Sequence, residues 1–419
     1  MRILYVSQYF PPEMGAPSAR VYELSREWVR AGHEVEVLTA FAHHPTGAKA
    51  REDRWTLTRR EEVDGIKVVR TYVYATPNRG VVRRMVSYLS FMLSAVFIGL
   101  VRVRRPEVVI ATSPQLLCGV AGYLLARLVR ARFVFEVRDL WPESMLAVEV
   151  MRENFIIRAL RHTARYLYRH SDGIVTVGNG YRDSIVSLYG IAPQKITVIP
   201  NGVDIGLFTP SAKANEIRQE YGWGNRFVVL YAGTLGMAHA LDQVLEAAKV
   251  LLHCGEILFA FVGEGAEKER LKALAAEWQL SNVQFIDQQP RPRVVKFYAA
   301  CDLGLVSLRD TPLFQAVLPS KVFEYLAMER PILLTVGGEA RKLVETAQAG
   351  EFVPPGDASA LANAIRRLAG TPDRLEAMGR SGREHVCREY CRRDLAARYI
   401  EALRSVCDGA TGLGARVES

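Results

Sequence analysis

The chain has 419 residues, of which 49% are hydrophobic and 24% are charged. This composition is that of an ordinary globular protein and excludes disorder for nearly the whole length, and the length exceeds what one hydrophobic core usually holds, so two domains are expected. The formal net charge of +9 falls entirely in residues 1–204, because residues 205–419 hold 26 basic and 26 acidic side chains.

The N-terminus and the cysteines indicate a cytoplasmic protein without structural disulfides. Met1 leads directly into strand-like residues, without the charged region followed by an apolar region that defines a secretory signal. The six cysteines are scattered and form no CxxC pair, and a chain of this length does not need disulfides. Cys387 and Cys391 are one helical turn apart but have no second pair of ligands, so no metal site is expected.

The N-terminal half alternates short apolar runs with helical stretches, which predicts a parallel sheet covered by helices. Strands are expected at residues 3–6, 35–39, 108–111, 133–137 and 174–177. Between the first two strands, residues 19–31 place Leu24, Trp28 and Val29 at helical spacing, and Gly32 ends the helix. These residues make one complete βαβ unit.

The same half carries arginines around an apolar run. Residues 79–105 contain six arginines and no acidic side chain, and the arginines flank the apolar residues 88–101. A run of about 14 residues is shorter than the roughly 18 to 20 needed to cross a bilayer, so it is expected to lie on a membrane. A second basic stripe consists of Arg158, Arg161, Arg165 and Arg169. We expect these surfaces to contact the anionic inner leaflet; a buried core helix with basic ends is the alternative.

The alternation restarts after residue 210 and predicts a second doubly wound domain. Strands are expected at residues 227–231, 258–262, 283–286, 303–306 and 332–335. Pro and Asn-Gly within residues 198–204 place a hinge near residue 200. We therefore expect an N-terminal domain over 1–200, a C-terminal domain over 201–385, and a helix with a tail over 386–419 that crosses back to the first domain. A ligand would bind at the carboxyl ends of both sheets.

Three loops after expected strands could hold phosphate groups. Gly15 and Ala16 follow the first strand and let backbone approach a ligand, and Ser18 is a candidate cap for the next helix; an ordinary turn is the alternative. Glycine-rich turns after two strands of the second half add four candidates: Gly233, Thr234, Gly263 and Glu264. No loop has a GxGxxG or Walker pattern, so dinucleotide redox chemistry and NTP hydrolysis are not expected.

The sequence Pro-Ser-Lys-Val-Phe-Glu-Tyr at residues 319–325 predicts a nucleotide-sugar site. Ser320 is a candidate N-cap, which would put Lys321 and Glu324 on adjoining surface in the first turn of a helix. Backbone N–H groups at a helix start favour a phosphate, Lys321 adds a positive charge, and Glu324 can accept hydrogen bonds from a ribose diol. A solvated ion pair between the two side chains is the alternative.

Together these segments resemble the retaining family-four glycosyltransferases of the GT-B fold. The matches are Gly-His-Glu-Val-Glu-Val-Leu-Thr at 32–39, Ile-Pro-Asn-Gly-Val-Asp at 199–204, Phe-Val-Gly-Glu-Gly at 261–265 and Lys-Val-Phe-Glu at 321–324. Segments 74–77, 137–144 and 319–325 resemble the branch that builds bacterial O-antigen and capsule repeat units, which includes transferases of N-acetyl-L-fucosamine and related 6-deoxy amino sugars. The resemblance implies an α/β protein with two Rossmann-like, doubly wound parallel-sheet domains facing across a cleft.

The resemblance also implies the substrates. The C-terminal domain would bind a UDP-sugar, and the N-terminal domain would bind an acceptor attached to polyprenyl diphosphate in the inner leaflet. Glu324 would bind the ribose and Lys321 the diphosphate, with the Gly15 loop facing the phosphates from the other domain, and backbone near Ile286 and Gln288 would hold uracil. Cations and N–H groups can stabilise the departing diphosphate, so no metal or other cofactor is expected.

The chain departs from the family pattern at several positions. The first acid of the usual two-glutamate motif falls at Ala316, so the sugar-facing acid is absent or supplied from elsewhere. The common arginine and lysine after the first donor-domain strand fall at Thr234 and His239. The acceptor-side histidine of many relatives aligns with Arg138, which could instead help to neutralise the diphosphate.

On the acceptor side, Asp139 is the candidate to orient the acceptor, with capping of a helix that starts near Trp141 as the alternative. His43 and His44 could line the same region, although a solvated loop histidine is the more common case. A UDP-N-acetylglucosamine 2-epimerase of the same fold and a non-catalytic carbohydrate-binding protein are the competing functions. A nucleic acid partner is not expected, because the basic residues flank aliphatic helices and do not interleave with exposed aromatic residues.

Overall fold

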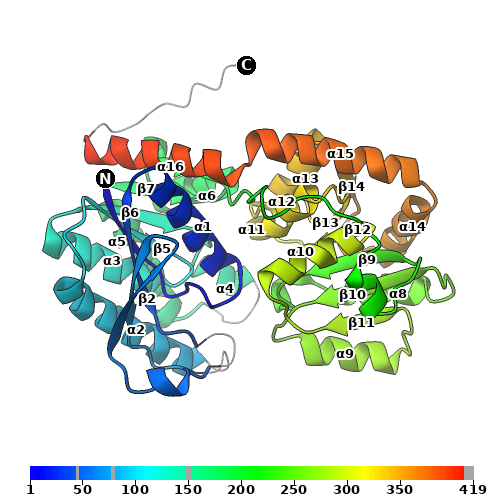
Figure 1. Ribbon diagram of the computed structural model, residues 1–419, viewed down its shortest axis with the longest axis horizontal. Coiled ribbons are helices and arrows are strands. Elements are labelled where there is room, and N and C mark those ends of the chain that lie inside the picture. The colour runs from blue at the N-terminus through cyan, green and yellow to red at the C-terminus, as the bar shows by residue number, and fades with distance from the viewer. Residues whose placement is uncertain (44–46, 77–80, 148–152, 410–419) are drawn as a thin grey trace. The chain divides into compact units, whose positions relative to one another are not determined.

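The computed structural model describes residues 1–43, 47–76, 81–147 and 153–409. The chain folds into two compact units. The first holds Met1–Pro200 together with the chain from Arg393 onward, and the second holds Asn201–Arg392. Each unit is an α/β domain built on a mostly or wholly parallel sheet (Figure 1).

The first unit contains an eight-stranded sheet in the order β3-β4-β2-β1-β5-β6-β7-β8. β3 pairs antiparallel with β4, and the other pairs are parallel; Ile3 on β1, for example, lies between Val35 on β2 and Val108 on β5. The strands are β1 Arg2–Val6, β2 Glu34–Ala40, β3 Thr58–Val63, β4 Ile66–Thr71, β5 Val108–Thr112, β6 Arg132–Val137, β7 Gly173–Thr176 and β8 Ile196–Val198.

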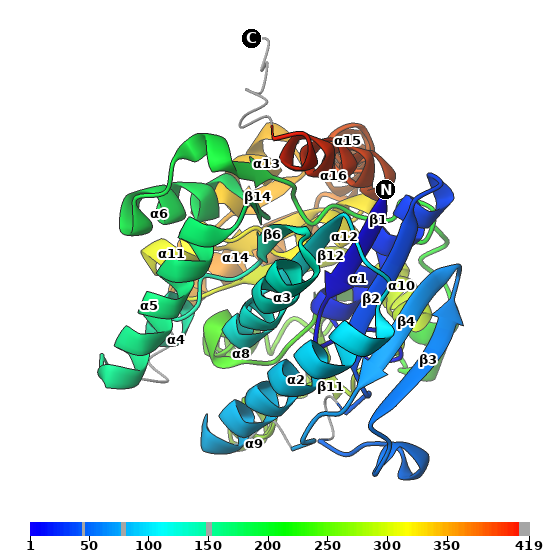
Figure 2. The ribbon, with the colours of Figure 1, turned by 90° about the vertical axis from the view of Figure 1, so that its left-hand side faces the viewer.

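Helices cover both faces of this sheet (Figure 2). The helices are α1 Ala16–Arg30, α2 Val81–Arg102, α3 Leu116–Val129, α4 Glu143–Ala147, α5 Phe155–His170, α6 Asn179–Tyr189 and α16 Arg392–Cys407, with the short 3-10 turns η1 Arg51–Asp53 and η2 Pro193–Lys195. Trp28 of α1 and Tyr399 of α16 share a core with Val37 of β2. The next residue, Leu38, lies close to Gly99 of α2 instead, because successive strand residues point to opposite faces.

The second unit contains a six-stranded, wholly parallel sheet in the order β11-β10-β9-β12-β13-β14. Its strands are β9 Phe227–Ala232, β10 Ile257–Val262, β11 Val283–Ile286, β12 Leu303–Ser307, β13 Ile332–Thr335 and β14 Gly350–Phe352. Its helices are α7 Glu216–Glu220, α8 Asp242–Val250, α9 Lys268–Glu277, α10 Arg291–Ala300, α11 Pro312–Gln315, α12 Ser320–Ala327, α13 Gly338–Thr346, α14 Ala358–Ala369 and α15 Pro372–Glu389, with the 3-10 turn η3 Met237–His239. All residues of β10 and β12 are buried, as expected for strands covered on both faces.

Each sheet has one point at which the direction of strand succession reverses. In the first unit the chain runs outward from β1 to β2 on one side and continues at β5 on the other, and in the second unit β9 and β12 have the same relation. Ligands of doubly wound sheets bind beside the carboxyl ends of the strands at such a switch point. The loops after β1, β5, β9 and β12 are therefore the positions at which a site is expected.

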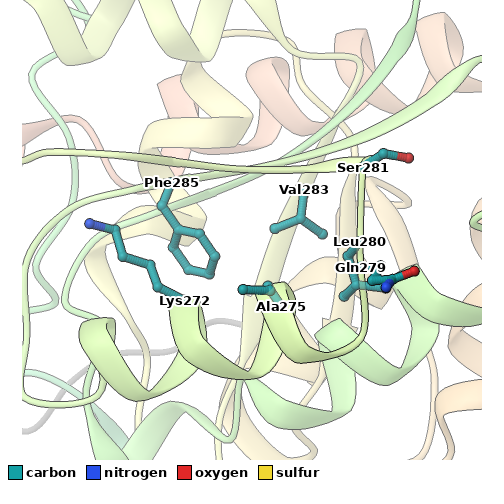
Figure 3. A pocket seen from close by; sticks show the side chains of 8 residues that line it. Lys272, Ala275, Gln279, Leu280, Ser281, Val283 and Phe285 are labelled. Carbon is teal, nitrogen blue, oxygen red and sulfur yellow. The ribbon is translucent and has the colours of Figure 1, made fainter.

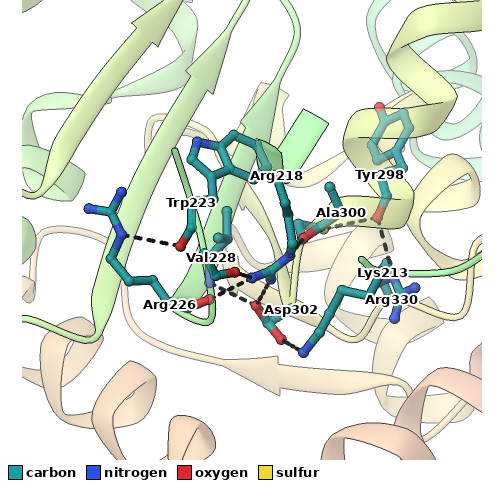
Figure 4. A network of polar contacts seen from close by, with 11 residues as sticks. Lys213, Arg218, Trp223, Arg226, Val228, Tyr298, Ala300, Asp302 and Arg330 are labelled. Atoms are coloured by element: carbon teal, nitrogen blue, oxygen red, sulfur yellow. Dashed lines mark hydrogen bonds and ion pairs between the residues drawn. The ribbon is translucent and has the colours of Figure 1, made fainter. Parts of the chain in front are cut away.

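Two buried ion pairs tie loops to the sheets, one at the amino ends of strands in the second unit and one near the carboxyl end of β6 in the first unit. In the second unit, the guanidinium of Arg218 donates to Asp302 at 2.6 Å, and Asp302 also accepts the Val228 N–H at 2.9 Å (Figure 4). In the first unit, Nε of buried Arg20 lies 3.0 Å from the buried carboxylate of Glu136. The other guanidinium nitrogens of Arg20 donate to the carbonyl oxygens of residues 199 and 200. These hydrogen bonds hold the chain in place where it leaves the first unit for the second.

The strands that the sequence predicts are all present, and the described residues contain four more: β3, β4, β8 and β14. β3 has the sequence Thr-Arg-Arg-Glu-Glu-Val and lies at an edge of its sheet, where charged side chains are tolerated and no apolar pattern is needed. β8 and β14 are three residues long, which is too short for a periodic signal.

Two helices differ from the sequence expectation. α2 has 22 residues and includes Arg83 and Arg84 before the apolar run. The helix is therefore longer than the predicted run of about 14 residues, and it is long and apolar enough to cross a membrane by length and composition. The helical stretch is interrupted at Tyr390, as predicted. α15 belongs to the second unit, because Gly379 and Gly382 pack against Glu329 and Leu326. The return to the first unit therefore falls at residue 393 and not at 386.

Candidate active site

The predicted lysine and glutamate lie in the first turn of α12, which follows β12 at the switch point of the second sheet. The helix begins at Ser320, and Pro319 occupies the cap position with φ −64° and ψ 138°. Ser320 is therefore the first helical residue, and the prediction that it is the N-cap is wrong, because Pro319 already has the extended conformation of a cap residue. The first N–H groups of a helix have no intrahelical acceptor, so this end attracts an anion.

The amino group of Lys321 is buried between an aromatic ring and the turn after β9. Nζ lies 3.6 Å from the ring centroid of Tyr231, and no described residue forms a hydrogen bond with it. A Cβ placed on Gly233 would lie 3.0 Å from Nζ. Burial lowers the pKa of Lys321 to about 7, although the negative charge of Glu324 opposes this shift. A buried polar atom without a partner destabilises the protein, and an anionic ligand at this position would supply that partner.

Glycine is required in the two turns because they approach each other closely. Gly233 has φ +141° and Gly263 has φ +151°, values that residues with side chains rarely adopt. A Cβ on Gly263 would lie 1.9 Å from the carbonyl oxygen of Gly233, and one on Gly265 would lie 2.1 Å from that of Leu235. The turn after β10 therefore supports the turn after β9, whose Gly233 and Thr234 are exposed and accessible to a ligand.

Glu324 is held by two side chains that the sequence analysis does not single out. The Tyr298 hydroxyl donates to Oε2 of Glu324 at 2.7 Å, and Nη1 of Arg291 lies 3.6 Å from Oε1. Burial, reinforced by the Glu324 charge, raises the pKa of Tyr298, so its hydroxyl stays a donor. Arg291 and Tyr298 are seven residues apart on α10 and hence on one helix face, and this spacing is the signal that could have paired them.

His239 does not supply the positive charge that the family pattern would place at its position. Its Nδ1 lies 3.3 Å from the Ser307 carbonyl oxygen, and its ring packs edge-on against Tyr231 with centroids 5.8 Å apart. Burial, together with the nearby charge of Lys321, lowers the pKa of His239 to about 3. The imidazole is therefore neutral near pH 7, and it can exchange hydrogen bonds but cannot neutralise a diphosphate.

The residues predicted to bind the base lie at the end of β11. Ile286 is buried and its carbonyl oxygen accepts the Gly263 N–H at 3.0 Å, while Gln288 is half-buried. The Glu264 carboxylate accepts a hydrogen bond from Lys268, and Lys268 also binds Asp287, both at 2.5 Å. The carboxylate of Glu264 therefore ties the turn to the strand beside it.

The loop before α12 contains Ala316, the position at which the first acid of the two-glutamate motif is missing. Ala316 caps the C-terminal end of α11 and is half-buried. The segment 308–319 contains one acid, Asp310, which is exposed and accepts a hydrogen bond from Gln315 at 3.1 Å. Asp310 is thus the candidate carboxylate of this loop, and a motif search for the usual spacing does not find it.

A pocket of about 360 Å³ lies elsewhere in the second unit, between α9 and the edge strand β11 (Figure 3). It is lined by Lys272, Ala275, Ala276, Gln279, Leu280, Ser281, Val283 and Phe285. None of the predicted donor-binding residues lines it, and its walls are mostly apolar, so it does not carry the predicted chemistry.

In the first unit, Gly15 and Ala16 lie at the exposed N-terminus of α1. Gly15 is the N-cap residue with φ +125°, and the helix begins at Ala16. The prediction that Ser18 caps a helix beginning near Ala19 is therefore wrong. Ser18 is buried inside the first turn, because glycine at the cap position lets the helix start earlier. The turn leaves an open helix end after β1, where an anion could bind.

Arg138 and Asp139 follow β6 and contact neighbouring turns of the same unit. Arg138 donates from Nη1 to the Pro17 carbonyl oxygen at 3.2 Å, and burial lowers its pKa against the opposing charge of Glu136. Asp139 accepts a hydrogen bond from the Ser144 hydroxyl of α4 at 3.0 Å, and burial raises the pKa of its carboxyl group. The helix begins at Glu143, two residues after Trp141 and thus close to the predicted start. The catalytic roles of both residues stay predictions.

His43 is buried against the loop after β1. Its backbone N–H donates to Glu13 Oε1 at 2.9 Å, and its Nδ1 donates to the Phe41 carbonyl oxygen at 2.9 Å. Gln8 lies 3.4 Å from Nε2 of the same ring. These contacts differ from a solvated loop histidine, since they hold two loops together at the carboxyl edge of the sheet. His44 lies outside the described residues.

The described part of the chain contains no group of three or more His, Cys, Asp or Glu side chains that could hold a metal ion. The candidate site in the second unit therefore consists of the buried Lys321 amino group, the start of α12 and the exposed Gly233 turn at the switch point. The Glu324 carboxylate is held beside it by α10. This combination has the chemistry to hold a phosphorylated ligand on a Rossmann-like domain.

Comparison with known families identifies the class. Residues 15–202 match the family described as "Glycosyl transferase 4-like domain", and residues 213–385 match "Glycosyl transferases group 1". The chain belongs to the group 1 glycosyltransferases with the GT-B fold, and it is an enzyme of the glycosyltransferase class.

Two bacterial glycosyltransferases are similar in sequence to much of this chain. The Escherichia coli K12 protein named as the colanic acid biosynthesis glycosyl transferase WcaI is 27% identical over 406 residues, covering 94% of this chain and 96% of its own. The Pseudomonas aeruginosa protein named as the glycosyltransferase WbjE is 26% identical over 272 residues, covering 64% and 67%.

Solved structures share the fold. The sucrose-phosphate synthase of Thermosynechococcus elongatus has a TM-score of 0.77 at 18% identity and covers 97% of this chain and 98% of its own. Anabaena HepE, solved in complex with UDP-glucose, has a TM-score of 0.72 at 16% identity and covers 97% and 100%.

Proposed function

We propose that this enzyme transfers a sugar, with retention of the anomeric configuration, from a UDP-sugar to a saccharide carried on polyprenyl diphosphate in the synthesis of O-antigen, capsule or exopolysaccharide. The observation that carries the proposal is the buried Lys321 amino group, which has no hydrogen-bond partner among the described residues and lies beside a helix start and the Gly233 turn. The WcaI and WbjE relatives support the place in polysaccharide synthesis, and the UDP-glucose complex of HepE supports the donor.

In the proposed reaction, Lys321 and the N–H groups at the start of α12 stabilise the negative charge that develops on the departing diphosphate. Glu324, oriented by Tyr298, accepts hydrogen bonds from the ribose diol. The acceptor hydroxyl attacks the face from which UDP leaves, and a diphosphate oxygen takes its proton. The cation and amides supply the charge that a metal would otherwise provide, so the reaction needs no cofactor.

The sugar is an N-acetylated or 6-deoxy amino sugar in this proposal. Ala316 stands where many relatives have a sugar-facing acid, which fits a sugar with fewer hydroxyl groups to bind. The first unit binds the acceptor, and Asp139 orients its hydroxyl. The enzyme works in the cytoplasm, associated peripherally with the inner face of the membrane that holds the acceptor.

A thermal unfolding assay with a panel of nucleotides and UDP-sugars tests the donor, since a ligand that binds the folded state stabilises it by mass action. UDP and one UDP-sugar should raise the melting temperature, and GDP or ADP should raise it less. Lys321→Ala should abolish the rise and the transfer, whereas the exposed Lys272→Ala on α9 should change neither. Equal stabilisation by all nucleotides would contradict a uridine site.

A transfer assay with a lipid-linked acceptor separates the proposal from its competitors. Glu324→Ala should abolish transfer while leaving the fold intact. Substantial epimerisation of a UDP-sugar without an acceptor would favour the isomerase. UDP-sugar binding without any chemistry, in the presence of membranes that carry acceptor, would favour a carbohydrate-binding protein.

A further inference from the structure

α2 presents an unbroken apolar stripe away from its own domain. The stripe consists of exposed side chains at intervals of three or four residues: Val82, Val86, Leu89, Leu93, Phe97 and Leu100. Phe97 is 67% exposed. Side chains at this spacing lie on one face of a helix, so the face that is usually polar on a surface helix is apolar here.

The opposite face of α2 packs against its own domain. Phe91 and Ala95 are fully buried, and a Cβ on Gly99 would lie 2.8 Å from Leu125 of α3. α2 therefore packs tightly on the sheet and on α3. A helix fixed in this way offers one face and not its whole circumference, which favours a helix that lies in a surface over one that crosses a bilayer.

α3 extends the apolar surface. α2 and α3 lie side by side on one face of the first unit's sheet (Figure 2), and α3 exposes Leu124 and Leu128, the latter by 58%. We call the six exposed residues of α2 and these two leucines the α2–α3 face. Contiguous exposed apolar patches of this kind are rare on soluble proteins that have no partner for them.

The charged side chains on α2 and α3 themselves all have one sign. Residues 65–106 and 108–135 contain no Asp or Glu. Arg83 is exposed at the start of α2, Arg102 is exposed at its end, and Arg127 is exposed on α3. By contrast, Arg161 of the basic stripe on α5 is paired with Glu143 and Glu153, so α5 offers less free charge than its sequence predicts.

We propose that the α2–α3 face is the surface by which the enzyme docks on an anionic lipid bilayer, with its apolar stripe in the headgroup boundary and its arginines on the lipid phosphates. An amphipathic helix with basic residues beside its apolar face binds such a surface through both interactions. A second protein copy would not be selected by two helices that carry only arginines, since the two sets of arginines would repel each other. The inference rests on the proposed function for the need to reach a lipid-linked acceptor.

Vesicle flotation with the full chain tests the docking. The protein should float with vesicles of phosphatidylcholine and phosphatidylglycerol, much less with phosphatidylcholine alone, and less at high salt, because salt screens the arginines. The double variant Leu93→Glu/Phe97→Glu should lower the partition coefficient about tenfold or more, since it removes two apolar anchors and adds repulsion. Arg83→Gln/Arg102→Gln should reduce the preference for the anionic vesicles.

Val250→Glu is the matched control, because it puts the same charge on an exposed apolar position of α8 in the second unit. It should float as the wild type does. Equal flotation of the wild type and the Leu93→Glu/Phe97→Glu variant would overturn the proposal, as would a wild type that does not float with anionic vesicles. A dimer that the double variant converts to a monomer, without vesicle binding by either, would assign the face to a second copy.

UDP-induced thermal stabilisation, measured on the same samples, keeps this test separate from the proposed function. A protein that UDP stabilises but that ignores vesicles would refute the docking surface alone. A protein that docks but is not stabilised by UDP would refute the donor site alone. The double variant should keep the UDP response of the wild type, because its substitutions lie in the other unit from Lys321.

Discussion

Substitution of Lys321 by methionine keeps most of the length of the side chain and removes the amino group that lies over Tyr231. In the folded protein the pKa of this amino group is about 7, because burial opposes its charge, whereas a lysine usually has a pKa of 10.5. The unfolded chain therefore binds this proton more tightly than the folded one. The free energy of unfolding should rise with pH between about 7 and 10.5 through this group.

The magnitude follows from the two pKa values. Their difference corresponds to about 5 kcal/mol at 1.36 kcal/mol per pKa unit, which is the destabilisation caused by the buried charge at and below about pH 7. Lys321→Met has no such charge. The variant should be more stable than the wild type near neutral pH, by up to about 5 kcal/mol, and the two should converge toward pH 10.

Donor binding should have the opposite pH dependence. A diphosphate favours the charged amino group, so UDP binding draws a proton onto Lys321 when the solution is above about pH 7. The protonated fraction of the free site falls from about one half at pH 7 to about one tenth at pH 8, and UDP affinity should fall about fivefold over that interval.

Calorimetric titration with UDP in two buffers of different ionisation enthalpy measures this uptake directly. The wild type should take up nearly one proton at about pH 8.5 and nearly none at about pH 6, and Lys272→Met should behave in the same way. Lys321→Met should bind weakly with no uptake. If the wild type gave identical enthalpies in both buffers at about pH 8.5 while binding UDP, the buried amino group would not be the group that meets the diphosphate.

Three further substitutions distinguish residues that stabilise the second unit from residues that shape the donor site. Asp302→Ala leaves the buried Arg218 charge without its partner and should lower the free energy of unfolding by about 3 to 5 kcal/mol in denaturant titration, with little change in UDP affinity. Gly263→Ala places a Cβ 1.9 Å from a carbonyl oxygen of the neighbouring turn and should lower stability by about 1 to 3 kcal/mol and weaken UDP binding as well. Tyr298→Phe removes the hydroxyl that donates to Glu324 and should weaken UDP binding by about 1 kcal/mol without lowering the melting temperature of the ligand-free protein, as equilibrium binding and thermal melting would show.

The polar partners of the site illustrate how far sequence reasoning reaches. Lys321 and Glu324 could be found because both lie in one helical turn after a proline, so their proximity follows from local geometry. Arg291 and Tyr298 could not be assigned to Glu324, because Tyr298 lies 26 residues before Glu324, Arg291 lies farther still, and α10 meets α12 only through tertiary packing. The pKa values of Lys321 and His239 likewise depend on burial, which no spacing reveals.

The apolar and charged helices of the first unit show the same division. The sequence indicates that residues 79–105 combine an apolar run with arginines, but the exposed stripe appears only once packing has buried Phe91 and Ala95. Arg161 looks equivalent to its neighbours along α5, and its pairing with Glu143 joins residues 18 positions apart. The free charge of a surface is thus a tertiary property.

The amino-acid sequence by itself determined the α/β class, the two-domain organisation, the position of the helix start that carries Lys321, and the family, because each depends on short-range periodicity or on contiguous motifs. The tertiary structure decided which glycines are needed for packing, whether the Lys321 amino group finds a hydrogen-bond partner among the described residues, and which helix face stays exposed. These properties depend on contacts between residues far apart in the chain, and such contacts exist only after the sheets have brought their loops together.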